Sequence, residues 1–280
     1  MLTMAKGMFT FIGNATCLIR FGGVTVLTDP NFLHRGERAY LGHGLSSKRL
    51  QEPAIQIENL PALDAIVLSH LHGDHWDRRA QKRLDHSLPV ITTEHAARAL
   101  RRRGFEQAEG LSVWQSRTVS RLGSWVRVTA VPGRHGPSWA TAMRILPPVM
   151  GSVLEFGSRS GPVELRMYLS GDTLVVDDLS EIPRRYPQID AGVFHLGGTR
   201  LPFGSKFPWG VTVTMDGVQG ARAAELILPD RVLAVHYDDY GVFASPLADF
   251  VEAMKASGLS DRFMHVARGD TVKLPDREKT

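Results

Sequence analysis

The first third of the chain consists of short apolar runs punctuated by glycine and proline, a pattern typical of β-strands. Residues 8–13, 15–23 and 24–30 are runs of this kind. Residues 64–69 (DAIVLS) form another, which we expect to be a buried strand. Residues 31–60 are rich in turn residues and are expected to be irregular. The opening of the chain is therefore predicted to be β-rich.

Helical spacing of apolar residues first appears at residues 74–84, where Asp74 is the expected N-cap. Further helices are expected at 94–104, 177–187, 216–227 and 246–258. Further strands are expected at 89–93, 112–116, 118–125, 126–135, 152–157, 163–173, 190–198, 232–237 and 264–274. Residues 137–151 and 201–210 have no clean period, and we expect both to be loops.

This succession of elements predicts a fold. A β-rich first half is followed by strands with interposed helices, and no shift in composition marks a boundary. Two sheets packed together, with helices on their outer faces, would bury all of the apolar strands. We therefore expect residues 1–280 to form a single domain.

Composition excludes several classes of protein. No apolar run reaches ~18 residues, so no membrane-spanning helix is expected, and the N-terminal run lacks a signal-peptide pattern. The single cysteine, Cys17, excludes an intramolecular disulfide, and we expect a small buried side chain in a cytoplasmic protein. The net charge of +4 favours an anionic substrate only weakly. The basic run 98–105 has no interleaved aromatic residues, so nucleic-acid binding is not expected.

Titratable side chains are crowded into SHLHGDHWD, residues 69–77, directly after the buried strand. The pattern H-x-H-x-D-H comprises His70, His72, Asp74 and His75. A strand that feeds a loop lets the first two histidines point the same way, while the aspartate and the third histidine face a second point. This arrangement suits two adjacent metal ions with nitrogen and oxygen ligands and an open position.

Two metal ions need more ligands, and the sequence offers three in a similar context. His135, Asp172 and His236 each follow or end a predicted strand. Functional loops are placed at the carboxyl ends of strands in parallel-type units. Convergence of these strand ends would assemble seven ligands, among which Asp74 and Asp172 are the candidate catalytic carboxylates.

The order H-x-H-x-D-H, a distant His, S-G-D-T and V-H resembles the metallo-β-lactamase fold superfamily along essentially the whole chain. GNATCLIRFGGVTVLTDPNF and LPALDAIVLSHLHGDHWD are similar to the branch that contains ascorbate-phosphate lactonases and N-acyl-phosphatidylethanolamine phospholipase D. The resemblance implies an α+β fold, a four-layer αββα sandwich in which helices flank two mixed β-sheets. It also implies one metal on His70, His72 and His135, a second on Asp74, His75 and His236, and Asp172 as the bridge.

Departures from the family's pattern narrow the reaction. His75 argues against antibiotic hydrolysis, because class B β-lactamases usually lack a histidine at that position. His72 argues against a flavo-diiron protein, which usually carries a carboxylate there, and no inserted RNA-binding arm is evident. Asn14 stands where many members of the branch have a histidine, so that histidine's role does not carry over.

Residues outside the ligand set are also candidates. Asp29 in VLTDP is expected to orient a ligand histidine or, alternatively, to form a turn before Pro30. His195 ends a predicted strand and could line the site. Trp139 and Trp209 lie in the two predicted loops, which could form an apolar substrate wall or make ordinary core or dimer contacts.

We therefore expect a metallo-hydrolase in which two divalent ions activate a water that attacks a phosphodiester, including a phospholipid-like one, or a lactone or other ester. The expected partner is a small or lipid-like anionic substrate. Zinc is the expected metal, with manganese and iron as alternatives, because these ligand types do not separate the three. An iron-dependent redox enzyme and a non-catalytic metal-binding protein remain as alternatives. The sequence leaves the oligomeric state open.

Overall fold

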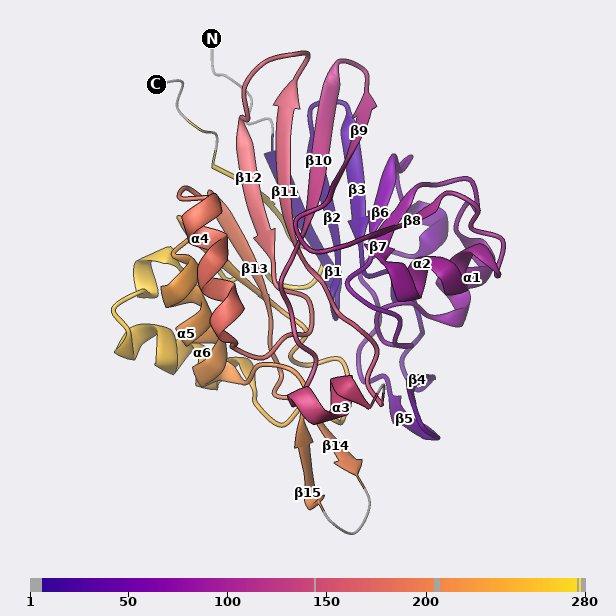
Figure 1. Cartoon of the computed structure of the whole chain (residues 1–280), viewed down its shortest axis with the longest axis vertical. Coiled ribbons are helices and arrows are strands. Elements are labelled where there is room, and N and C mark those ends of the chain that lie inside the picture. The colour runs from indigo at the N-terminus through magenta and orange to yellow at the C-terminus, as the bar shows by residue number, and fades with distance from the viewer. Residues whose placement is uncertain (1–6, 144, 204–206, 276, 278–280) are drawn as a thin grey trace.

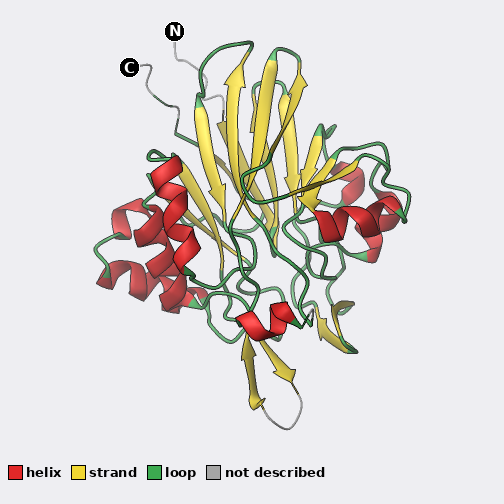
Figure 2. Cartoon of the chain, in the orientation of Figure 1, coloured by secondary structure: helices red, strands yellow, loops and turns green. Residues whose placement is uncertain are grey.

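Two β-sheets pack face to face and carry helices on their outer faces (Figures 1 and 2). The computed structural model describes residues 7–143, 145–203, 207–275 and 277, and for 141, 202, 203 and 207–209 it describes the backbone alone. The predicted four-layer α+β sandwich with two mixed sheets is confirmed. Among the described residues, no helix is both long and apolar enough to cross a membrane.

The first sheet has seven strands in the order β17-β1-β2-β3-β6-β7-β8. They are β1 (Gly7–Gly13), β2 (Thr16–Phe21), β3 (Val24–Thr28), β6 (Ala65–Val67), β7 (Val90–Thr93), β8 (Ala108–Leu111) and β17 (Thr271–Lys273). Strands β3, β6, β7 and β8 run parallel to one another, and the other pairings are antiparallel. Because β1 pairs with β17, both ends of the described chain lie in this sheet.

The second sheet has six strands in the order β16-β13-β12-β11-β10-β9. They are β9 (Ser116–Arg121), β10 (Ser124–Val131), β11 (Gly151–Ser158), β12 (Leu165–Leu169), β13 (Ala191–His195) and β16 (Arg231–Val235). The pairings β12–β13 and β13–β16 are parallel and the rest are antiparallel, so this sheet is also mixed.

The helices form the two outer layers. They are α1 (Arg78–Arg83), α2 (Glu94–Arg101), α3 (Ser138–Ala142), α4 (Glu181–Arg185), α5 (Gly217–Ile227) and α6 (Leu247–Ala256), with 3-10 turns η1 (Ile57–Asn59), η2 (Asp177–Ser180) and η3 (Ser260–Arg262). Helices α1 and α2 lie beside the first sheet and α4, α5 and α6 beside the second, whereas α3 lies below both (Figure 1).

Three apolar clusters hold the layers together, which explains why the strands are apolar on both faces. In β2, Cys17 and Ile19 point into the core between the sheets, while Leu18 points toward α1 and α2. In β13, Val193 faces the other sheet and Phe194 packs against the helices. Alternate residues of one strand thus enter different layers of the core. Cys17 is buried as expected, and burial raises the pKa of its thiol.

Several predicted elements differ from the observed ones. The loops predicted at 137–151 and 201–210 contain helix α3 and the hairpin β14 (Arg200–Phe203) and β15 (Phe207–Thr212). The irregular segment 31–60 contains the hairpin β4 (Arg38–Gly42) and β5 (Leu45–Lys48) together with η1. The strand predicted at 112–116 is mostly a turn that follows β8.

The prediction of Asp74 as an N-cap is wrong. Helix α1 begins at Arg78, and the carboxylate of Asp77 caps it by accepting hydrogen bonds from the backbone N–H groups of Arg79 (2.7 Å) and Ala80 (2.8 Å). The same carboxylate accepts from the backbone N–H groups of Phe32 and Leu33. Asp77 therefore joins the segment after β3 to the start of α1. Asp74 does not cap the helix and instead lies among the candidate metal ligands.

Replacement of Asp77 by alanine is expected to destabilise the fold by about 2 kcal/mol, because it removes a helix cap and leaves buried N–H donors without an acceptor. Urea unfolding of Asp77→Ala and of Asp85→Ala measures the effect. Asp85 is the matched control, because its exposed carboxylate accepts from Ser87 N in a surface turn. Equal midpoints for the two variants would contradict the assigned role.

Candidate metal centre

The candidate residues come together at one edge of the sandwich, where strands of both sheets end. His70 follows β6, His135 follows β10, Asp172 follows β12, and His236 follows β16. Strands β10, β12, β13 and β16 share one direction in their sheet, so their carboxyl ends meet at the same edge. The titratable residues that the sequence places after predicted strands therefore lie together at this edge of the sandwich.

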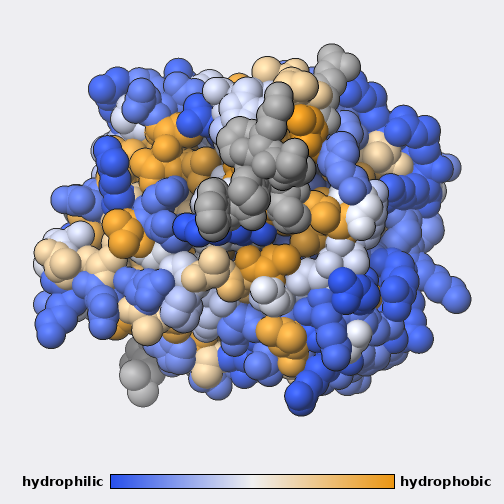
Figure 3. Space-filling model, turned by 90° about the horizontal axis from the view of Figure 1, so that it is seen from below, coloured by the Kyte–Doolittle hydropathy of each residue, from blue (hydrophilic) through white to orange (hydrophobic). Residues whose placement is uncertain are grey.

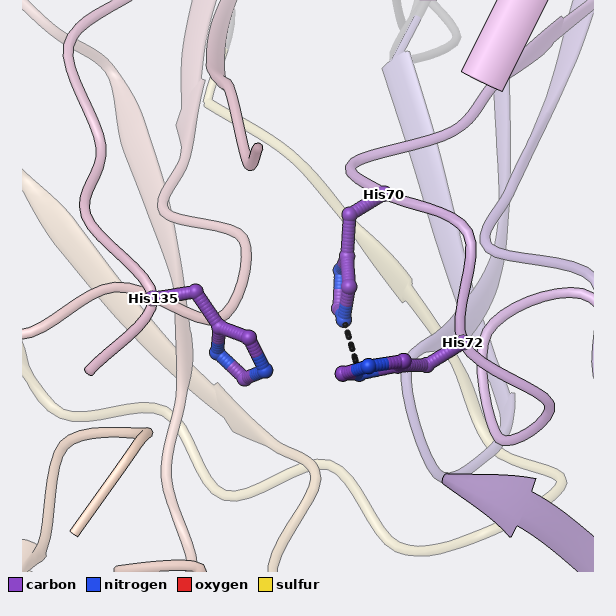
Figure 4. Close-up of side chains that lie close together, drawn as sticks. All are labelled: His70, His72 and His135. Carbon is purple, nitrogen blue, oxygen red and sulfur yellow. Dashed lines mark hydrogen bonds between the residues drawn. The ribbon is translucent and has the colours of Figure 1, made fainter. Parts of the chain in front are cut away.

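One group of candidate ligands is made of three histidines (Figure 4). His70 and His72 come from one loop, and His135 approaches from the other sheet. The Nε2 atom of His70 lies 3.0 Å from Nδ1 of His72. One nitrogen atom from each of the three rings lies within 4.8 Å of the others, a spacing at which all three could coordinate one ion.

A second group is made of Asp74, His75 and His236, again with ligand atoms within 4.8 Å of one another. The Nε2 atom of His236 lies 3.3 Å from Oδ2 of Asp74. Asp172 lies beside this group, with Oδ2 3.3 Å from His75 Nε2 and Oδ1 3.6 Å from His236 Nδ1. Asp172 also joins His70 and His75 in a further group of close ligand atoms. Its carboxylate therefore stands between the two groups.

The histidine rings are oriented by acceptors around the site. Nδ1 of His135 lies 3.1 Å from the backbone carbonyl of Asp172, and Nδ1 of His236 lies 3.1 Å from that of Leu196. A carbonyl oxygen accepts a hydrogen bond only from an N–H, so these contacts favour a proton on Nδ1 of each ring, which leaves Nε2 of the neutral ring as the nitrogen for a metal. This is the tautomer that a ligand histidine with Nε2 toward a metal requires.

Asp29 and His195 lie directly behind the second group. Oδ2 of Asp29 lies 3.3 Å from His75 Nδ1 and 3.3 Å from His195 Nε2, and Oδ1 accepts a hydrogen bond from Ser69 N at 2.7 Å. His195 is fixed on its other side by Ser170, whose Oγ lies 3.2 Å from Nδ1. The position of Asp29 is the one expected of a residue that orients a ligand histidine.

Burial and charge set the protonation of the site. Burial, together with nearby His75 and His135, holds the pKa of His70 well below its usual value, and burial and His135 lower that of His72 to about 3. Burial raises the pKa of Asp172, but His236 and His75 more than offset this and hold it well below its usual value. Burial lowers the pKa of His135 as well, so the three histidines of the first group are neutral and Asp172 is ionised, as metal ligands must be. Burial lowers the pKa of His75 and His236 too, but the nearby aspartates more than offset this and raise both above the usual value.

Polar atoms left without a hydrogen bond mark the centre of this cluster. Oδ1 of Asp74, Oδ1 of Asp172 and Nε2 of His75 are buried and have no hydrogen-bond partner among the described residues. Buried polar atoms are ordinarily paired, and carboxylate oxygen and imidazole nitrogen are donors that divalent metals accept. The donor set therefore fits metal ions at both groups.

A buried network that the sequence did not reveal holds the loop of His72 and Asp74 in place. Arg49 donates to the carboxylate of Asp239 (3.0 Å) and to the side-chain oxygen of Asn31 (2.6 Å). Asn31 Nδ2 in turn donates to the carbonyl of Gly73 (3.1 Å). Asn31, Arg49 and Asp239 thus position the loop, although no spacing in the sequence links them.

Asn14, at the position where the resemblance led us to expect a histidine, belongs to the same network. Its Nδ2 donates to the carbonyl of Asp74 at 2.7 Å, and its backbone N–H donates to Asp239 Oδ2 at 2.6 Å. Its carbonyl accepts from His236 N at 2.9 Å. Asn14 therefore links the loop of the first sheet to the end of β16 in the second.

The structure does not test whether Trp139 and Trp209 line the substrate site. Trp139 lies in α3 and is 37% exposed. Trp209 lies in β15, and its side chain falls outside the described residues. Helix α3 and the β14–β15 hairpin do lie at the same end of the sandwich as the candidate ligands (Figure 1). A substrate-lining role for both tryptophans stays a prediction.

Replacement of Asp29 by asparagine is expected to weaken metal affinity about 10–100-fold, the usual cost of losing an acceptor behind a ligand histidine. The amide has one acceptor oxygen instead of two, so it cannot accept from Ser69 N on one side and from His75 and His195 on the other. Its NH2 group then faces a donor, and the contact that orients His75 is weakened. Competition with a chelating dye measures the affinity. Asp64→Asn is the control, since its carboxylate accepts from Thr25 N (2.8 Å) at the far end of the same sheet. Equal affinities for both variants would contradict this role of Asp29.

Comparison with known proteins finds similarity over most of the chain. The family model for the beta-lactamase superfamily domain matches residues 25–237. A metal-dependent hydrolase of Archaeoglobus fulgidus is 27% identical over 270 residues, which cover 95% of this chain and 98% of that protein. An N-acyl-phosphatidylethanolamine-hydrolyzing phospholipase D of Caenorhabditis elegans is 40% identical over 87 residues, 31% of this chain and 24% of that protein.

Solved structures share the fold. The crystal structure of an isothiocyanate hydrolase from Delia radicum gut bacteria matches with a TM-score of 0.76 and 22% identity. The match covers 95% of this chain and 99% of that one. At this level of identity the likeness establishes the arrangement of sheets and helices.

Proposed function

The chain belongs to the beta-lactamase superfamily and is a metal-dependent hydrolase, and on this premise we propose that it binds two divalent metal ions and cleaves a phosphodiester or an ester. The observation that carries the proposal is the convergence of two groups of buried nitrogen and oxygen ligands on either side of Asp172. Zinc is the expected metal, because imidazole and carboxylate ligands suit it.

Each side chain has a distinct proposed role. His70, His72 and His135 would hold one ion, and Asp74, His75 and His236 would hold the other. Asp172, which lies beside ligand atoms of both groups, would serve both ions, and Thr214 Oγ1 steadies it by donating to Oδ2 at 2.9 Å. Asp29 and His195 keep His75 oriented. When bound, the ions would supply Lewis acidity, which lowers the pKa of a water to about 7 and polarises the scissile bond.

This arrangement needs no serine or cysteine nucleophile. Cys17 points into the core between the sheets and is buried, so it does not reach the site. Asp74 and Asp172 are the proposed catalytic carboxylates, and the Oδ1 atom of each is buried without a hydrogen bond among the described residues. A lipid-like substrate is supported by the local identity to the phospholipase D of Caenorhabditis elegans.

We also propose that the chain is one domain. The pairing of β1 with β17 supports this, because the first and last described strands belong to one sheet. The candidate ligands come from both sheets, so the site needs the whole sandwich.

A metal-reconstituted activity screen tests the proposal. Metal-free protein is loaded separately with zinc, manganese and iron, and each form is assayed on a phosphodiester, a phospholipid and an acyl lactone. Turnover of at least one substrate, lost on chelation and restored by metal, is expected. Failure of all three substrates with all three metals would contradict the proposal. Tightly bound iron with oxygen uptake would instead favour a redox enzyme.

A further inference from the structure

A pocket of about 320 Å³ opens beside His72, a candidate metal ligand. His72 and Gly73 form its inner wall, strand β4 and its turn form a second wall, and the start of α1 forms a third. The volume lies within the range of small-molecule sites, about 300–1,000 Å³. A molecule in this pocket would therefore touch a proposed metal ligand at one end.

Glycine lets the hairpin approach closely enough to form this pocket. Gly73 N donates to the carbonyl of Tyr40 at 2.9 Å. A Cβ at Gly73 would lie 2.6 Å from that carbonyl oxygen and 2.7 Å from the nitrogen of Tyr40, both backbone atoms. The loop that carries His72 is thus in direct backbone contact with β4, and the pocket has a fixed position relative to the candidate metal ligands.

The lining combines apolar side chains with an excess of positive charge. Leu33, Leu71 and Trp76 are among the apolar residues that line the pocket. Arg38, Arg78 and Arg103 line it as well. A substrate with an apolar body and an anionic end would find a partner for each part.

In the part of the chain that the structure describes, two of the three arginines that line the pocket have no acidic partner and are available to bind an anionic ligand. Among the described residues that line the pocket, Asp77 is the only acid; it is buried, and its carboxylate accepts from four backbone N–H groups. Arg78 is paired with Glu37. Within the described part of the chain, the guanidinium of Arg38 donates hydrogen bonds only to Ser46, which is neutral, through Nε and Nη2. Among the same residues, the guanidinium of Arg103, which also lines the pocket, has no hydrogen bond or ion pair. The net positive charge is therefore carried by Arg38 and Arg103.

We propose that this pocket binds an oxyanion, a phosphate or carboxylate, carried by the substrate at a distance from the scissile bond, with Arg38 and Arg103 as specificity-determining residues. The inference rests on the proposed function and names the substrate class of that same site. The molecular surface on the side of α1 and α2 is strongly hydrophilic, whereas apolar side chains gather near the middle of the face seen from below (Figure 3). The anionic end of the substrate would accordingly point toward α1.

Direct binding tests the proposal without requiring turnover. Calorimetric titration of the metal-loaded protein uses phenyl phosphate, phenylacetate and benzyl alcohol as probes. At least one anion should bind about tenfold or more tightly than the alcohol, and Arg38→Gln or Arg103→Gln should weaken its binding about tenfold, the effect of one charge-assisted hydrogen bond. The tighter of the two anions identifies the group as phosphate or carboxylate.

Arg102→Gln is the matched control, because this neighbouring arginine is also exposed but does not line the pocket. The proposal is overturned if the double variant Arg38→Gln/Arg103→Gln binds the anions as tightly as the unaltered protein, or if Arg102→Gln weakens binding as much.

Kinetics separates this proposal from the proposed function. Two aryl esters with the same scissile bond, one with a distal anion and one without, are compared in each variant. The arginine variants should raise KM for the anionic ester about tenfold and leave its kcat unchanged. For the neutral ester, both KM and kcat should stay the same. An equal loss of activity on both esters would overturn the anion site. If the unaltered protein hydrolysed neither ester, the result would count against the proposed hydrolase. The binding titration would still decide whether the anion site exists.

Discussion

Replacement of Asp172 by alanine is expected to lower kcat/KM by about 10³-fold or more, which corresponds to about 4 kcal/mol of transition-state stabilisation. The reason is its place between the two ligand groups: Oδ2 lies 3.3 Å from His75 Nε2 in the second group, and a carboxylate oxygen lies within 4.8 Å of a ring nitrogen of His70 in the first. Without this carboxylate, no side chain among the described residues would hold the two ions at a fixed separation. Steady-state kinetics on the substrate found by the activity screen measures the loss.

Two further variants make the Asp172 experiment specific. Asp172→Asn keeps the size of the side chain but loses its charge, and it is expected to be nearly as inactive. Asp178→Ala removes an exposed carboxylate from η2, which follows Asp172 in the chain, and should change kcat/KM less than twofold. An Asp172→Ala protein that retains a tenth of the activity would rule out the bridging role.

Asp239→Asn is expected to be the most destabilising single replacement in the network behind the site, at about 3–5 kcal/mol. Arg49 and Asp239 are both fully buried and lie 3.0 Å apart. The second carboxylate oxygen of Asp239 also accepts from Arg268 at 2.9 Å. Loss of the negative charge would leave the buried guanidinium of Arg49 without its counter-charge, which is far costlier than losing an exposed ion pair.

The neighbouring residue supplies the control for this experiment. Asp238 also pairs with Arg268, at 2.7 Å, but is exposed. Asp238→Asn is therefore expected to change the free energy of unfolding by about 0–1 kcal/mol. Urea unfolding of both variants at the same metal loading gives the comparison, and similar losses in the two would mean that burial of the Arg49–Asp239 pair does not matter.

The layers of the fold were predictable because their cause is local. Strands such as β2 are apolar at successive positions, and only a sheet covered on both faces buries such a strand. His70, His135, Asp172 and His236 were predictable as a set because each stands at the end of an apolar run. Parallel strand ends meet in space, so their sequence context implied their proximity.

Other features had no local signal. Asp74 and Asp77 both precede the helical pattern, and only the folded chain shows that Asp77 caps α1 and Asp74 faces the site. The β14–β15 hairpin was missed because its sequence contains two prolines and two glycines, which favour loops. The pairing of Arg49 with Asp239 joins residues 190 positions apart, and no periodicity relates them.

The most direct test of the two-metal account is the metal content of the reconstituted protein, measured by plasma mass spectrometry on three forms of the chain. The unaltered protein is expected to hold two ions per chain. His135→Ala and His236→Ala, each of which disrupts one ligand group, are expected to hold about one tightly bound ion each and to be inactive. A single ion in the unaltered protein, or two ions and full activity in both variants, would contradict the account.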